Sequence, residues 1–457
     1  MILVLIIDAL AVVLLVGAVL TKGFERSLPV AAFLLMLFPN ECQIRIPDVF
    51  EITTQRIVVV TLIVLFVTLG RKNKEPLPLK YLLFLQIAWM MVSMICSVVY
   101  TISLKTVLSQ LFDYFVPFYI FSRSITQVQT INKTLAAFVS AMAVCCIFGT
   151  SEAYGFGSIV SIFPSVAHSF AERRFEADRG IRAMSTFGHP ILFGAALSLA
   201  IPLALYLLTR TKQTAHRVLL WISLMAMFLN VYKTGSRGAW IATVISVGIL
   251  LVFGLKRFRR YVGAIVLLSI TVLVLRPGVW ETINNNYVAT LDSGSPQGSS
   301  YEWRYALYGI AVRELAKDPG RALWGYGPES FLHLNLTGEF QGHVVPFESC
   351  DSSVAQIMIE NGYIGLAITI LLLFRGLSTS FASFRIMPHP LNLLPLVLFT
   401  SLTAFCFLMT NVALFGWGQQ TYMFWILLSC AMIYPRLLLH HNATTQSRVV
   451  SLIPAYE

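Results

Sequence analysis

Arg237 is the residue whose chemistry the sequence exposes most clearly. It lies in the polar stretch Thr234-Gly235-Ser236-Arg237-Gly238, between the apolar runs 218–232 and 239–255. An arginine is always charged, and a cation at a membrane boundary is costly unless an anion meets it. The guanidinium matches phosphate oxygens, and the two glycines permit close backbone approach. The stretch therefore predicts a phosphate-binding site with Ser236 beside Arg237; a plain turn with a snorkelling arginine is the alternative.

The second group of residues that could do chemistry precedes the apolar run 354–374. Glu348 and Asp351 are carboxylates at the mouth of that run, and a carboxylate there can act as a general acid or base. His333 and His343 lie in the same loop and remain candidates for the base. The alternative for Asp351 is a helix N-cap, a position that Asp favours.

The composition places these residues in a membrane protein. Hydrophobic residues make up 57% of the chain and charged residues 12%, about half the charged share of ordinary soluble domains. The seven cysteines show no metal-ligand spacing and no disulfide framework, so we expect neither a metal site nor a cofactor held by them. The first apolar run lacks the basic start of a cleaved signal peptide, so we expect it to remain as a span.

The fold class predicted is an all-α polytopic membrane protein with about 12–13 transmembrane helices. Apolar runs long enough for a span, or nearly so, lie at 2–20, 28–39, 57–70, 79–101, 107–121, 134–151, 190–208, 218–232, 239–255, 261–275, 354–374, 391–411 and 419–439. We divide the chain into N-terminal helices (1–151), helices with a basic outer loop and the Arg237 stretch (152–275), a large outer loop with short helices (276–353), and C-terminal helices with a cytoplasmic tail (354–457).

Basic residues orient the helices. Assigning alternate loops to the cytoplasm gives that side more than half of the 33 Lys and Arg. Most of the others cluster on the outer side, where few are normally found, and an anionic ligand explains the clustering better than topology does, with solvated loop charge as the alternative. We expect four arginines on the outer side to bind substrate. Three of them lie in the 152–189 loop, Arg174, Arg179 and Arg182, and the fourth, Arg304, lies in the large loop.

The outer segments contain further candidates. Gly188-His189-Pro190 is turn chemistry that starts a helix, and His189 is a candidate substrate ligand there. Trp303, Leu307, Ile310 and neighbours have helical spacing, typical of packing or of a helix on the membrane surface. The stretch Trp324–Glu329 is rich in glycine and aromatic residues, as expected for a loop over a cavity, and Tyr326 in it is a candidate sugar contact.

The order of these motifs resembles the O-antigen ligase and Wzy-type polysaccharide polymerase superfamily. The resemblance covers about 180–375: Gly188-His189-Pro190 with Gly194, the Arg237 stretch, a large outer loop with Arg304 and Trp324–Pro328, and Asp351-Ser352 before Gly362-Tyr363-Ile364-Gly365. It implies a membrane glycosyltransferase of the GT-C class that takes glycan from an undecaprenyl diphosphate carrier on the periplasmic side, without a nucleotide sugar or an obligatory metal. Ligases of the superfamily typically have His-Asn where this chain has Asp351-Ser352, and Asp there looks more like the polymerase branch.

The resemblance therefore favours polymerisation of lipid-linked repeat units into a surface polysaccharide, in the bacterial inner membrane. A ligase that passes glycan to lipid A-core or another acceptor is the first alternative. The partners expected are the undecaprenyl-diphosphate-linked donor, a glycan or lipid acceptor, membrane lipid and a chain-length regulator, with no nucleic acid. A transporter or flippase is the alternative of another class; we expect it to carry charged residues within spans, where the only carboxylates we place are Asp113 and, near the end of the first span, Asp8.

The first testable prediction concerns topology. Single cysteines introduced at 152–189 and 276–353 should react in intact cells with a membrane-impermeant thiol reagent, because the basic residues place those segments outside. Cysteines at 256–261 should react only after the cells are opened. Labelling of 256–261 from outside would invert the arrangement.

Overall fold

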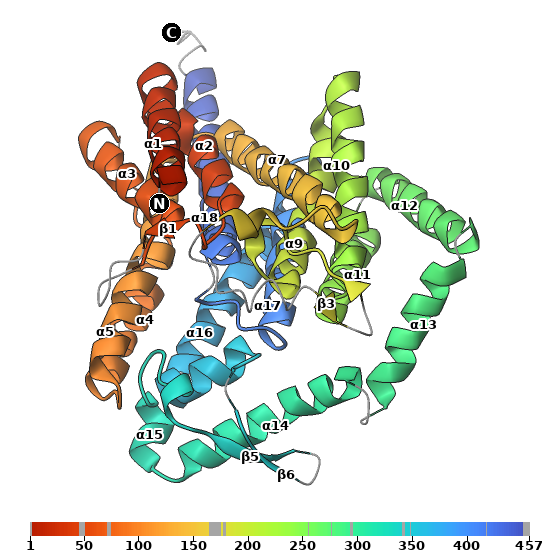
Figure 1. The fold of residues 1–457 in the computed structure, drawn as a ribbon. Helices are drawn as coiled ribbons and strands as arrows, with labels where there is room; N and C mark the ends of the chain where they lie inside the picture. Colours follow the sequence, from red (N-terminus) through yellow and green to blue (C-terminus); the bar gives the residue numbers. More distant parts are fainter. Residues whose placement is uncertain are drawn as a thin grey trace, which may run out of the picture.

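The computed structural model describes residues 2–44, 51–70, 75–163, 175–176, 180–254, 256–275, 277–292, 296–340, 343–347, 349–416 and 418–450. Within them the chain is almost entirely helical, with three short antiparallel strand pairs, which confirms the all-α fold class. The helices form one bundle, and an outer lobe lies at one end of it (Figure 1).

The N-terminal part supplies helices that run up and down the bundle. Their bounds are α1 (Ile2–Lys22), α2 (Phe24–Leu37), α3 (Thr54–Leu69), α4 (Lys80–Ile95), α5 (Tyr100–Gln110), a π-helical turn η1 (Leu111–Phe115), α6 (Val116–Ser124) and α7 (Val128–Ala153), with strands β1 (Gln43–Ile44) and β2 (Ile52–Thr53) between α2 and α3. After α7 come the short helix η2 (Ile159–Ile162), strands β3 (Phe175–Glu176) and β4 (Gly180–Ile181), and η3 (Ser185–Phe187).

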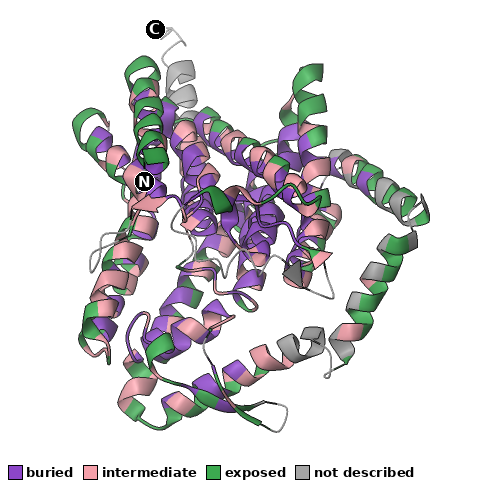
Figure 2. Cartoon of the chain, viewed as in Figure 1, coloured by how far each residue is buried: buried purple, intermediate pink, exposed green. Residues whose placement is uncertain are grey.

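The centre of the bundle is α9 (Pro190–Arg210). It packs against α7, α10 (Thr214–Lys233), α11 (Arg237–Phe253) and α17 (Leu393–Met409), and nearly all of it is buried (Figure 2). Small residues permit this packing: a Cβ on Gly194 would lie 2.6 Å from the Cβ of Ala239 on α11. The last helices, α16 (Ser353–Ile386) and α18 (Gly418–Val450), complete the bundle beside α17.

The outer lobe begins where the chain leaves the bundle. Helices α12 (Lys256–Leu275) and α13 (Pro277–Leu291) run outward as an arm, and α14 (Pro296–Ala316) returns to pack against α16 (Figure 1). Then follow α15 (Pro319–Trp324), η4 (Phe331–His333) and the hairpin of β5 (Thr337–Phe340) with β6 (His343–Pro346). The apolar stripe of α14 packs inside the lobe: Leu307 and Ile310 are buried in a cluster that includes Phe347 and Met358. The interpretation of that stripe as packing is confirmed. The stripe faces the interior of the lobe and does not lie on a membrane surface.

Six helices among the described residues are long and apolar enough to cross a membrane: α1, α7, α9, α10, α16 and α18 up to Leu439. Four shorter apolar helices accompany them: α3, α4, α11 and α17. Each of the thirteen apolar runs overlaps a helix. The chain is thus a multi-pass membrane protein, and the count of 12–13 spans stays a prediction.

Asp8 and Asp113 both hold helices together. Asp113, in η1, forms an ion pair with Arg56 at 3.0 Å and accepts a hydrogen bond of 2.6 Å from the Tyr422 hydroxyl. Asp8 accepts one of 2.7 Å from Thr54. Our expectation that these were the only carboxylates within spans was wrong, because Glu360 lies in α16 and is buried.

A break in α16 joins the outer lobe to the bundle. Gly362 has φ 67° and ψ −176°, so the helix is interrupted there. The carbonyl oxygens of the preceding turn accept hydrogen bonds from outside the helix: that of Ile359 from Tyr326 N–H at 2.9 Å, and that of Glu360 from Gly327 N–H at 2.9 Å and the Ser93 hydroxyl at 2.6 Å. The Trp89 indole N–H donates to the Asn361 carbonyl at 2.9 Å. The glycine-rich loop 324–328 and helix α4 thus satisfy the backbone that the break releases.

The glycines on both sides of this contact leave room for it. A Cβ on Gly325 would lie 2.4 Å from the Glu360 carbonyl, and a Cβ on Gly362 would lie 2.2 Å from the Leu323 carbonyl oxygen. Both glycines also have positive φ. The sequence motifs Trp324–Pro328 and Gly362–Gly365 are therefore two halves of one backbone contact.

We predict that Gly362→Ala destabilises the protein by about 1–3 kcal/mol from backbone strain alone, with the clash against Leu323 adding to it. The measurement is the thermal midpoint of the purified, detergent-solubilised protein. Gly248→Ala in α11 is the matched control, because no heavy atom lies within 4 Å of a Cβ there. An equal midpoint for both variants would contradict the role given to the break.

Candidate active site

Arg237 is the first residue of α11. Ser236 caps that helix: its side-chain oxygen accepts a hydrogen bond of 3.5 Å from the Ala239 N–H, and the residue is buried. The free N–H groups of a first helical turn carry partial positive charge. Arg237 adds a full charge at the same place, so this end of α11 favours an anion such as a phosphate.

Arg182 supports the turn that precedes α11. Its side chain is buried, and its Nε–H donates a hydrogen bond of 2.7 Å to the Thr234 carbonyl. The neighbouring Ala183 N–H donates to the Lys233 carbonyl at 3.1 Å. The outer loop before α9 is thereby fastened to the turn that carries Arg237.

Glu152, at the end of α7, fixes that loop from the other side. Its carboxylate accepts hydrogen bonds from the Met184 N–H at 2.8 Å, the Ser185 N–H at 2.6 Å and the Ser158 hydroxyl at 2.6 Å. Sequence reasoning missed this residue, because its backbone partners Met184 and Ser185 lie some thirty positions away and follow no periodic pattern.

His189 starts α9. Its Nδ1 accepts a hydrogen bond of 3.2 Å from the Ile191 N–H, so the turn chemistry expected of Gly-His-Pro is confirmed. The preceding Gly188 has φ 65°, and a Cβ there would lie 2.2 Å from an oxygen of Glu41. Burial raises the pKa of the Glu41 carboxyl, and a backbone hydrogen bond partly opposes the shift. Glu41 is a second carboxylate that sequence reasoning missed at this end of the bundle.

Asp351 lies just before α16, with 44% of its side chain exposed. Its Oδ2 is 3.9 Å from Nη2 of Arg304, whose Nε–H donates a hydrogen bond of 3.1 Å to the Asn411 carbonyl. The cap of α16 is Ser352, which accepts from the Ala355 N–H at 3.3 Å. The alternative that made Asp351 the N-cap is therefore wrong, and the Asp351 carboxylate does not cap the helix.

Tyr308 holds Asp351's neighbour in place. Its hydroxyl hydrogen bonds to the Ser352 hydroxyl at 2.7 Å and donates to the Thr410 carbonyl at 2.9 Å. Burial raises the pKa of the Tyr308 hydroxyl, with the Ser352 hydrogen bond opposing, so this group stays a neutral donor near pH 7. The start of α16 is thus tied to the end of α17.

The end of α17 brings the two groups of predicted residues together. A Cβ on Gly238, beside Arg237, would lie 3.9 Å from the Leu408 side chain, because α11 packs along α17. Arg304 bonds to Asn411, three residues further along. Arg237, Arg304 and Asp351 therefore lie at the same end of the bundle, around one helix terminus.

Other predicted residues lie elsewhere. Tyr326 is packed in the outer lobe, and its hydroxyl hydrogen bonds to the backbone and carboxylate of Glu314 at 3.3 Å. His333 and His343 are exposed on the lobe. Three predicted site residues lie outside the described residues: Glu348, Arg174 and Arg179.

The outer lobe adds a buried carboxyl near the break in α16. Burial raises the pKa of Glu329, and the charge of His333 partly opposes the shift. Over the part of the chain that the structure describes, no group of three or more His, Cys, Asp or Glu is placed to hold a metal ion.

The comparison with protein families indicates which class of protein carries this site. The sequence model of the O-antigen ligase family matches residues 222–370. Residues 222–370, about a third of the chain, are thus similar to an O-antigen ligase domain. The matched region runs from α10 into α16 and includes Arg237, Arg304 and Asp351, which supports the superfamily resemblance and a polysaccharide-related ligase or polymerase role. No curated protein matches the chain.

The geometry at the start of α16 predicts different stability effects for substitutions at Ser352 and Asp351. Ser352→Ala should lower the free energy of unfolding by about 1–2 kcal/mol, because the cap of α16 and a partner of Tyr308 are lost. Asp351→Asn should leave stability nearly unchanged. The carboxylate is half-exposed and its ion pair with Arg304 is long, at 3.9 Å, so the pair contributes little to stability. Thermal midpoints of the two purified variants give the comparison. The reverse order would return the cap to Asp351.

Proposed function

We propose that the protein polymerises oligosaccharide repeat units carried on undecaprenyl diphosphate, on the periplasmic face of the bacterial inner membrane. The observation that carries the proposal is the position of Arg237, at the N-terminus of α11, and of the Asp351–Arg304 pair around the same end of α17. A transfer from a lipid diphosphate needs a cationic and a basic group at separate points of one site. These residues supply both.

The proposed reaction is a single displacement at a sugar carbon. A hydroxyl of the acceptor glycan attacks the anomeric carbon of the donor and passes its proton to the Asp351 carboxylate. The bond between that carbon and the diphosphate oxygen breaks, and its electron pair leaves with the lipid diphosphate. Arg237 and the N–H groups of the first turn of α11 stabilise the charge on that leaving group, and one well-placed donor of this kind contributes about 3–4 kcal/mol.

Arg304 has two roles in this scheme. Its hydrogen bond to the Asn411 carbonyl fixes it to the end of α17, and its guanidinium, 3.9 Å from the Asp351 carboxylate, places a positive charge beside the candidate base. Arg182, which is buried behind the Thr234 carbonyl, orients the turn that carries Arg237. The cations are thus divided between charge stabilisation and support.

Ligation of finished glycan to a lipid acceptor is the second candidate function, and the description of the matched family favours it. The polymerase is favoured by the pair Asp351-Ser352, because ligases typically have His-Asn at that position. A transporter is less well supported, because the three carboxyl groups identified within spans have partners: Asp8 and Asp113 in contacts between helices, and Glu360 in a hydrogen bond from Gln356.

A deletion strain separates the two candidates. We expect short lipid-linked repeat units to accumulate in it, as the substrate of a polymerase would. Full-length polymer left on its carrier would identify a ligase instead. A strain with unchanged glycans would contradict both.

Complementation of that strain tests the residues. Arg237→Lys should fail to restore normal polymer, because the ammonium keeps the charge but loses the planar fork. Asp351→Asn should reduce transfer by about 10²–10⁴-fold, because an amide takes no proton. All variants are compared at equal levels in the membrane. Wild-type polymer from Asp351→Asn together with inactive Glu348→Gln would move the base to Glu348.

A further inference from the structure

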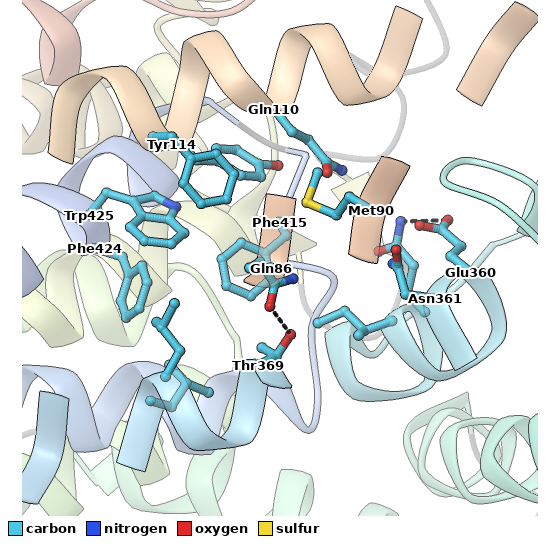
Figure 3. A pocket seen from close by; sticks show the side chains of 15 residues that line it. Gln86, Met90, Gln110, Tyr114, Glu360, Asn361, Thr369, Phe415, Phe424 and Trp425 are labelled. Atoms are coloured by element: carbon cyan, nitrogen blue, oxygen red, sulfur yellow. Dashed lines mark hydrogen bonds between the residues drawn. The ribbon is translucent and has the colours of Figure 1, made fainter. Parts of the chain in front are cut away.

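A cavity lies alongside α16, between α4, the α5–η1 segment, α16, α18 and the loop that follows α17. Figure 3 shows side chains from all of these elements around the space.

The wall of this cavity carries an unusual set of polar groups for a membrane bundle. Besides Tyr114, three glutamines, an asparagine, one carboxyl and one further hydroxyl line it: Gln86, Gln110, Gln356, Asn361, Glu360 and Thr369. Amides offer both donors and acceptors, and so do the hydroxyl groups of a sugar. Gln356 donates to Glu360 and Thr369 to Gln86, whereas the Oδ1 of Asn361 has no partner among the described residues, and a polyprenyl tail would leave it unsatisfied at a cost of about 1–3 kcal/mol. The wall favours a ligand with many hydroxyl groups over a lipid chain.

Aromatic rings form the opposite wall. Tyr114 and Trp425 lie nearly parallel, with 6.2 Å between ring centroids and 17° between planes, and Phe415 is tilted against Tyr114 at 5.8 Å. Rings of this kind give a flat apolar surface with polar edges. A pyranose ring has one apolar face and a polar rim, so it matches this combination of walls.

Two buried polar atoms on the wall have no partner within the described part of the molecule: Oδ1 of Asn361 and Nε1 of Trp425. Asn361 is 8% exposed and Trp425 is 4% exposed. One atom is an acceptor and the other a donor, so ligand hydroxyls can satisfy both. Figure 3 shows both residues at the edge of the cavity.

The charge of the wall excludes a phosphate. Among the described residues that line the cavity there is no Lys, Arg or His, and the carboxyl there is that of Glu360, which accepts a hydrogen bond of 3.1 Å from Gln356. An anionic ligand would meet a buried carboxyl without a compensating cation. The diphosphate therefore belongs with Arg237, and this cavity takes an uncharged group.

Helix α16 sets the distance between the two places. Nine positions separate Asp351 from Glu360, and at about 1.5 Å per residue this is about 13 Å along the helix. We propose that the cavity is a saccharide subsite, which binds a neutral sugar residue of the same glycan chain whose other residue reacts beside Asp351. The subsite rests on the proposed function for the identity of the chain, and on the cavity wall for its preference for sugar.

Binding of free glycan tests the subsite without relying on transfer. The probe is the oligosaccharide released from the strain's own surface polysaccharide, titrated calorimetrically into the full-length protein in detergent. Asn361→Ala and Trp425→Phe should each weaken binding about five- to tenfold, as expected for one buried hydrogen bond. Trp425→Phe keeps an aromatic ring and removes the N–H.

Two further variants complete the experiment. Asn392→Ala is the matched control, because Asn392 at the start of α17 also has an unpartnered buried Oδ1 but does not line the cavity; it should bind as the wild type does. Arg237→Ala should abolish transfer in cells and leave binding of the free oligosaccharide unchanged. Loss of binding in Arg237→Ala would place the sugar at the other site and overturn the subsite.

The remaining outcomes separate the two proposals. If the wild-type protein does not bind the oligosaccharide, or if Asn361→Ala and Trp425→Phe bind it as well as the wild type, the cavity holds water alone and the subsite is wrong, whatever the result for transfer. If the glycans of the deletion strain are unchanged while the cavity variants lose binding, the proposed transfer reaction is wrong and the subsite stands.

Discussion

The structure depends on one backbone requirement: the carbonyl groups released by the break in α16 must find donors. In a bundle surrounded by lipid, an unsatisfied backbone group costs several kcal/mol, so a helix breaks only where other elements can satisfy it. Here Trp89 and Ser93 of α4 and the N–H groups of Tyr326 and Gly327 do so. The outer lobe and the bundle are held in register by these bonds.

This requirement also orders the functional groups. The short first part of α16 carries Asp351 before its cap and Glu360 before its break, so one rigid segment sets the spacing of the candidate base and the cavity. The lobe loop that satisfies the break also carries Glu329, whose pKa burial raises. A single contact thus positions groups that are far apart in sequence.

Much of the fold could be predicted from the sequence, because hydropathy reports directly on apolar helices. Arg237 was identified by the polarity of its stretch, and its position at a helix start agrees with that interpretation. The N-cap of α16 was assigned one residue early, since Asp and Ser are nearly equivalent caps and adjacent here.

What the sequence could not show are the partners of buried groups. Arg182 looked like a ligand for anions, yet its Nε–H donates to the Thr234 backbone; Tyr326 looked like a sugar contact and packs in the lobe. Glu360 was overlooked, because a single acid inside an apolar run has no periodic signal. The cavity is formed by four helices whose order in the chain gives no hint that they meet.

The hydrogen bonds across the break bear on how such a chain can change over time. The lobe 276–353 looks like an insertion between two membrane helices, yet its loop completes the backbone of α16, and α4 completes the rest. The lobe is therefore not a self-contained module. A different lobe would fit this bundle only together with matching turns of α4 and α16, because the bonds across the break join all three pieces.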